Sequence, residues 1–133
     1  MVSGKQQSSG TQKGYGYRDL VVWQKGMELA KRICRVTQSF PTEEKFGLVS
    51  QMRRSAVSVP SNIAEGQARH TTKEFIQFVS HAEGSVAELD TQLRLGVDLG
   101  YCPNGDAAEI TALIEEIQRM LNGLRRNLSA RTR

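Results

Sequence analysis

An apolar stripe at helical spacing runs directly through a proline in the middle of the chain. Its members recur every three or four residues, the pattern of a helix that buries one face, and they are Val49, Met52, Ala56, Val59 and Ile63. Pro60 lies within this stripe. A proline inside a helix removes one backbone donor and crowds the carbonyl four residues earlier. The sequence therefore predicts a buried helix with a kink at Pro60.

A second stripe on the same helix is small and polar. Arg54, Ser58, Ser61 and Glu65 follow one another at helical spacing, roughly opposite the apolar stripe. This pattern fits a solvated surface, and it equally fits a place where another helix or subunit approaches the backbone. Both interpretations stay open from the pattern alone.

Three further segments have helical periodicity, and no segment has the alternation expected of a strand. Each predicted helix has a cap or a helix breaker at its ends. The first helix covers residues 20–39, and the second runs from a cap at Thr42 to Gly66. The third runs from a capping box at 71–74 to Leu99, and the fourth from a cap at Asp106 to Leu128. Only short connections join them. The sequence therefore predicts an all-α, antiparallel up-down-up-down four-helix bundle with a kinked second helix.

Gly84 lies in the interior of the third predicted helix. A glycine there costs about 1 kcal/mol relative to alanine, so close approach of another backbone is the expected reason for it. A hairpin centred on residue 69 would place Ala56 beside Ala82, and Arg53 or Arg54 near Gly84. We therefore expect small residues of the second and third helices to contact each other there.

The 133 residues suffice for one domain with a single modest core. The predicted organisation is a flexible basic arm over residues 1–17, a bundle over 18–129 and a basic tail over 130–133. Because the chain lacks both a long apolar run and the apolar stretch of a secretory signal, a cytoplasmic protein without membrane contact is expected.

Cationic residues are predicted to gather at one end of this bundle. In the up-down-up-down topology, the start of the first helix, the second turn and the end of the fourth helix meet, and the formal net charge of +4 favours anionic partners. The candidate nucleic-acid contacts are Arg18, Lys25, Arg69, Lys73, Arg119, Arg125 and Arg126. Acidic residues at 43, 44, 98, 106 and 109 are expected at the opposite end.

Two functions for the cationic end remain open. Clustered Lys and Arg can bind the phosphates of a nucleic acid, which then releases counterions. Cations near a helix C-terminus can instead increase solubility and interact favourably with the helix dipole. If the first interpretation holds, changing Arg125 and Arg126 together to Glu weakens RNA or DNA binding without lowering the melting temperature.

No catalytic, metal or cofactor site is predicted. His70 and His81 lack partners at ligand spacing, Cys34 and Cys102 are expected to be idle thiols, and no general base accompanies the serines. The polar residues around the second helix are assigned instead to a structural or subunit network, whose members are Arg53, Arg54, Ser58, Asn62, Glu65 and Gly84. We therefore expect a protein that is not an enzyme.

Several motifs together resemble a known family. They lie at residues 20–23, 40–41, 46–48, 51–66, 69, 73–75, 84–85, 88–89, 99–101 and 120–124. In these segments the chain resembles the four-helix-bundle proteins encoded in intervening sequences of bacterial 23S ribosomal RNA genes. It is also similar to the accessory proteins of diversity-generating retroelements.

The resemblance implies association with nucleic acid rather than catalysis. The retroelement proteins assemble as homopentamers and bind both nucleic acid and a reverse transcriptase, so a homopentamer is implied here too. The alternatives are an accessory protein that binds a reverse transcriptase and its RNA, and a structural bundle with no role in nucleic-acid binding.

Overall fold

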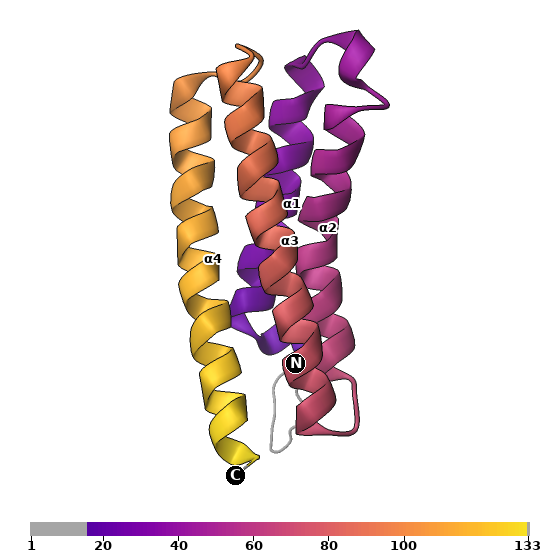
Figure 1. Ribbon diagram of the computed structural model, residues 1–133, viewed down its shortest axis with the longest axis vertical. Helices are drawn as coiled ribbons and strands as arrows, with labels where there is room; N and C mark the ends of the chain where they lie inside the picture. Colours follow the sequence, from indigo (N-terminus) through magenta and orange to yellow (C-terminus); the bar gives the residue numbers. More distant parts are fainter. Residues whose placement is uncertain (1–15, 133) are drawn as a thin grey trace, which may run out of the picture.

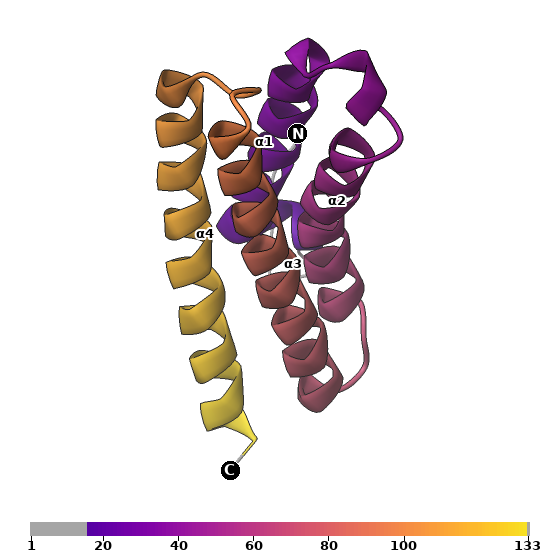
Figure 2. The same cartoon turned by 45° about the horizontal axis from the view of Figure 1, so that its top comes forward.

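The computed structural model describes residues 16–132, which form an all-α, antiparallel four-helix bundle as the sequence predicts (Figure 1). In chain order the elements are η1 (Tyr17–Asp19), α1 (Val21–Val36), η2 (Thr37–Ser39), η3 (Thr42–Glu44), α2 (Leu48–Gln67), α3 (Thr72–Asp98) and α4 (Asn104–Arg131). Each helix packs on its neighbour in the chain, and α1 packs on α4, which closes the bundle (Figure 2). Most of the predicted arm at 1–17 lies outside the described residues.

The core is built from one face of each helix. Its fully buried large side chains are Leu29, Ile33, Met52, Val59, Ile63, Val79, Leu89, Leu93, Ile114, Ile117, Leu121 and Leu128. Burying one such side chain contributes about 1.5–3 kcal/mol, so this shared core decides the fold. Between residues 16 and 132, no helix combines the length and the apolar content that a membrane span requires.

Pro60 lies inside α2, which is assigned as one helix from Leu48 to Gln67. The proline is buried, and its ring faces Gly26 of α1, where an added Cβ would lie 3.4 Å from the proline Cβ. Gly26 therefore allows α1 to pass close to the ring. The kink at Pro60 stays a prediction.

Residues of α3 lie close to Gly66 of α2, whereas no other element lies close to Gly84. A Cβ on Gly66 would lie 2.7 Å from the Cβ of Phe78 and 2.9 Å from Cδ1 of Phe75, whereas nothing lies within 4 Å of a Cβ on Gly84. The predicted contact at Gly84 within the hairpin is therefore wrong. The assumed register caused the error, because Ser58 pairs with Ser85 and the hairpin centre thus lies later than residue 69.

The predicted capping box at the start of α3 is confirmed. The backbone N–H of Glu74 donates to Oγ1 of Thr71 at 3.1 Å, and that hydroxyl donates to Oε1 of Glu74 at 3.0 Å. The predicted end at Leu99 is also confirmed. Gly100 adopts a φ of 80°, and the N–H of Tyr101 donates to the carbonyl of Gly96 at 2.9 Å, a pairing typical of glycine-terminated helices.

Two predicted caps are wrong. Thr42 starts only the short element η3 and makes no side-chain cap; instead Oε1 of Glu44 accepts from the N–H of Leu48, the first residue of α2, at 3.3 Å. Asp106 lies within the first turn of α4, which Pro103 precedes. There its charge complements the helix dipole without capping the helix.

Candidate nucleic-acid interface

The start of α1, the α2–α3 turn and the C-terminal half of α4 share the lower half of the bundle in Figure 1. We call this half the basic end, and its described cations are Arg18, Lys25, Arg69, Lys73, Arg119, Arg125, Arg126 and Arg131. The acids that accompany them are Asp19, Glu65, Glu74, Glu83 and Glu116. Cations therefore outnumber acids here, as the sequence predicts.

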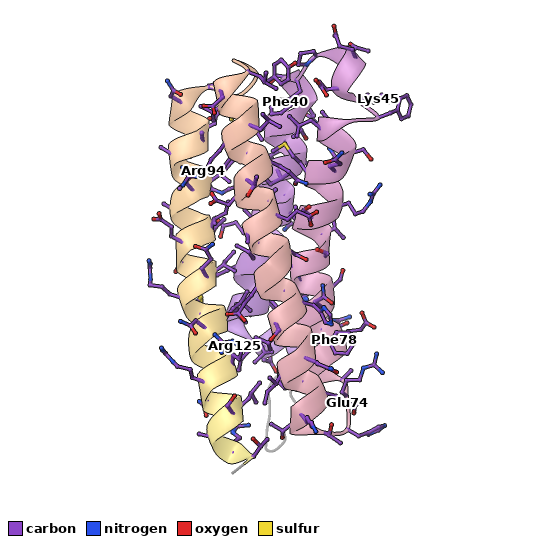
Figure 3. The ribbon with its side chains drawn as sticks, in the orientation of Figure 1. Phe40, Lys45, Glu74, Phe78, Arg94 and Arg125 are labelled. Carbon is purple, nitrogen blue, oxygen red and sulfur yellow. The ribbon has the colours of Figure 1, made fainter. Side chains whose placement is uncertain are left out.

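Some of the predicted phosphate contacts are already committed to acids of the same chain. The Arg125 guanidinium donates from Nε to Oε1 of Glu83 and from Nη2 to Oδ1 of Asn122, each at 2.8 Å. Arg125 thus joins α4 to α3, and Figure 3 labels it where the two helices meet. Lys25 on α1 forms a longer ion pair with Glu116 on α4, at 3.5 Å.

Arg69 in the α2–α3 turn is held by two neighbours. Its Nη2 donates to Oε2 of Glu65 at 3.3 Å, and its guanidinium carbon lies 4.7 Å from the ring centroid of Phe78. The Phe78 ring meets His81 edge-on, with the ring centroids 5.9 Å apart. Stacking of this kind restrains the guanidinium while one side of it still faces solvent.

Other cations of the basic end are exposed, and no acid of residues 16–132 pairs with them: Lys73, Arg119, Arg126 and Arg131. Arg119 and Arg126 are seven residues apart on α4, so they share one helix face and lie about 10.5 Å apart along the axis. This geometry gives α4 an outward strip with two available guanidinium groups.

Arg18 lies in η1, immediately before α1. Its guanidinium carbon is 6.0 Å from the ring centroid of its neighbour Tyr17, and its carbonyl accepts from Nε2 of Gln24 at 2.9 Å. The ring of Tyr17 in turn contacts Trp23, with the centroids 5.4 Å apart. These contacts fix the backbone of η1 against α1 while Arg18 itself is exposed.

The opposite end of the bundle carries the predicted acids. The Tyr101 hydroxyl, after α3, donates to Oε2 of Glu44, before α2, at 3.1 Å, which joins the two connections at this end. This hydrogen bond is the largest cause of a raised Tyr101 pKa, and burial and the charges of Glu44 and Glu43 raise it further. The five predicted acids and the basic end therefore lie at opposite ends of the bundle.

Among the polar residues predicted as one structural or subunit network, only Asn62 and Ser58 bond to each other within the described chain. Asn62 donates to the carbonyl of Ser58 at 2.8 Å within its own helix, Glu65 pairs with Arg69, and Arg54 is exposed with no partner in the described chain. Ser58 reaches α3, with its Oγ 2.6 Å from that of Ser85. Helical spacing alone aligned these residues but did not specify their partners.

Arg53 on α2 binds the C-terminal end of α1. It donates from Nε to Oγ1 of Thr37 at 2.9 Å and from Nη2 to the carbonyl of Cys34 at 3.1 Å. The Thr37 hydroxyl also contacts the carbonyl of Ile33. Arg53 thus supplies a donor to the Cys34 carbonyl, in the last turn of α1, where helix carbonyls lack partners within the helix.

Thr37 and Gln92 are buried polar residues that were not predicted from the sequence. Thr37 follows an apolar run and could be expected near a helix end. Gln92 interrupts the apolar face of α3, and that interruption was the available signal.

Across residues 16–132 no group of three His, Cys, Asp or Glu could hold a metal ion.

Cys102 is buried and Cys34 is partly buried, and neither forms a disulfide. Burial is the larger cause of the raised pKa of the Cys102 thiol, and the nearby Asp106 carboxylate adds to it. Both effects keep this thiol protonated and therefore weakly nucleophilic.

Comparison with known proteins gives a consistent picture. A family model described as 23S rRNA-intervening sequence protein matches residues 18–123. A crystal structure of a protein of unknown function from the S23 ribosomal protein family of Bacteroides thetaiotaomicron is 26% identical, with a TM-score of 0.73, and the match covers 78% of this chain and 97% of that one. The comparison with curated proteins gives no significant match.

Proposed function

Since the chain belongs to the 23S rRNA-intervening sequence protein family, we propose that it is a non-enzymatic, homo-oligomeric protein that binds RNA through its basic end. The observation that carries this proposal is the exposed strip of α4, where Arg119 and Arg126 share one face and neither pairs with an acid. Cations without internal partners are available to neutralise phosphates.

Lys73 and Arg69 extend this surface at the α2–α3 turn. Lys73 is exposed, and Arg69 is stacked on Phe78. Arg125 and Lys25 are better assigned to holding α4 against α3 and α1, because each already has an acidic partner. The proposed contact is with phosphates rather than with base edges, so duplex DNA, which also carries phosphates, should bind to the same cations.

Homo-oligomerisation would strengthen such contacts. One basic end offers only a few phosphate contacts, but several copies held together act as linked sites whose affinities reinforce one another. The resemblance described above implies a pentamer, in which five basic ends would be repeated around one axis. Mass measurement in solution tests this number directly.

A protein partner is the second candidate, and an exposed aromatic ring favours it. Phe46 is 89% exposed and lies between η3 and α2, at the end of the bundle opposite the basic end. A reverse transcriptase that contacts Phe46 would leave the basic end able to bind that enzyme's RNA. A reverse-transcriptase gene beside this gene would favour this candidate, whereas a location inside a ribosomal RNA gene would favour the first.

The test is the affinity for single-stranded RNA and for duplex DNA measured over a range of salt concentrations. For duplex DNA the logarithm of the association constant should fall with the logarithm of salt concentration, with a slope of about 0.9 for each phosphate contacted. A slope near zero, or no binding at low salt, would contradict the proposal.

A further inference from the structure

An arginine stacked on a phenyl ring lies at the α2–α3 turn of the basic end. The guanidinium carbon of Arg69 lies over the Phe78 ring, 4.7 Å from its centroid, and the His81 ring meets the same phenyl ring edge-on. Arg69 comes from the turn after α2, and the two rings come from α3. Figure 3 labels Phe78 in the lower half of the bundle, where α2 and α3 meet.

Phe78 is fixed in place by the packing of α2 on α3. A Cβ on Gly66 would lie only 2.7 Å from the Cβ of Phe78, so the backbone of α2 passes directly beside this residue. Phe78 is partly buried, and His81 covers one edge of its ring. The ring is therefore a fixed support for the guanidinium of Arg69.

One edge of the Arg69 guanidinium is held as well. Its Nη2 donates to Oε2 of Glu65, four residues earlier, at 3.3 Å. This carboxylate attracts the guanidinium and repels phosphates, so Arg69 is a weaker phosphate contact than the unpaired Lys73. The Arg69 side chain is nevertheless 42% exposed. Because the ring covers one face and the carboxylate one edge, the second face of the guanidinium is open to solvent.

A planar cation held in this way suits an aromatic base. Proteins that bind RNA stack unpaired bases on aromatic side chains and on arginine guanidinium planes. A base on the open face of Arg69 would form a three-layer stack, with the guanidinium between the base and the Phe78 ring. Bases inside a duplex already have both faces covered by neighbouring base pairs, so only an unpaired base has a face to offer.

We propose that Arg69 and Phe78 form a stacking site for one unpaired base of the bound RNA. This inference rests on the proposed function, because RNA must reach the basic end before a base can stack there. It adds a preference for single strands, loops and bulges to the general attraction of the basic end for phosphates.

The experiment compares two single-stranded RNA probes that have the same number of phosphates. One is an oligouridylate, whose bases stack weakly on one another, and the other is its abasic counterpart, in which hydrogen replaces every base. Stacking of one base typically strengthens binding by about five-fold or more. The full-length wild type should therefore bind the intact strand at least about five-fold more tightly than the abasic strand at the same salt concentration.

Arg69→Lys is the test variant. Lysine retains the charge but has no plane, so the ratio of the two affinities should fall toward one while the salt slope stays the same. Lys73→Gln is the matched control, because it removes a charge near the same turn but no plane. This control should weaken the binding of both strands alike and leave their ratio unchanged. Both residues are exposed, so both variants should fold as the wild type does.

Phe78→Leu tests the support beneath the guanidinium. Leucine retains the Cβ beside Gly66 but has no ring, so the affinity ratio should fall as it does in Arg69→Lys. The proposal is overturned if both of these variants keep the wild-type ratio, or if Lys73→Gln lowers the ratio as much as Arg69→Lys does.

The same measurements test the proposed function separately. If the wild type binds the intact and the abasic strand equally well and both affinities fall with salt, the stacking site is refuted and the proposed phosphate binding is not. If the wild type binds neither strand at low salt, the proposed function fails and this inference fails with it.

Discussion

The guanidinium of Arg125 on α4 donates from Nε to the Glu83 carboxylate on α3 over 2.8 Å. Because of this contact, two arginines that are adjacent in the sequence have different roles. Arg125 holds two helices together, whereas Arg126 is exposed and pairs with no acid in the described part of the chain. The predicted double change of both arginines to Glu would therefore disturb the fold as well as the proposed binding surface.

Arg125→Ala should lower the free energy of unfolding by about 1 kcal/mol, because the Glu83 carboxylate loses its cross-helix partner in a partly solvated site. Thermal or urea unfolding at neutral pH measures the change. Arg126→Ala is the matched control, and it should stay within about 0.5 kcal/mol of the wild type. Equal stability of the two variants would show that the ion pair does not support the bundle.

Gly66→Ala should destabilise the bundle by about 1–3 kcal/mol, a typical cost of overpacking a close contact. The new Cβ would lie 2.7 Å from the Cβ of Phe78, an atom that can move only with its helix. Gly123→Ala should instead be neutral or stabilise by up to about 1 kcal/mol, because it meets open space within a helix. Urea unfolding compares the two variants, and a tolerated Gly66→Ala would refute the close approach.

The hydrogen bond between Tyr101 and Glu44 should make stability depend on pH at alkaline values. Because the folded-state pKa of Tyr101 is raised above its usual value of 10.0, the contribution is complete below pH 10 and is lost as pH rises through the folded pKa. The stability difference between the wild type and Tyr101→Phe should therefore be constant below pH 10 and shrink above it. A difference that stays constant or grows above pH 10 would contradict this assignment.

Periodicity and capping residues were sufficient to predict the bundle. The apolar stripes of α2, α3 and α4 appear at the expected spacing in the core, and the box at Thr71 and the glycine at 100 mark helix ends as expected. These signals are local, so they can be recognised without knowledge of the tertiary fold.

Contacts between helices could not be predicted in the same way. Because the predicted α2–α3 register was shifted, a close contact was expected at Gly84, but it occurs at Gly66. Only the three-dimensional packing shows that Gly66 lies against Phe78 and that Gly84 faces open space. Likewise, charge placement predicted the basic end but did not separate Arg125, which pairs with Glu83, from Arg126. That distinction depends on which helix lies opposite each side chain.

The most direct measurement of the central claim is RNA affinity across salt concentrations for two variants of equal charge. In one, Arg119 and Arg126 on α4 are changed to Glu; in the control, the exposed Lys31 and Arg35 on α1 are changed to Glu. The α4 variant should bind RNA more weakly and lose about one unit of salt slope for each phosphate contact removed, with an unchanged melting temperature. The affinity and salt slope of the α1 variant should change much less. Equal affinities and equal slopes for the two variants would contradict the central claim.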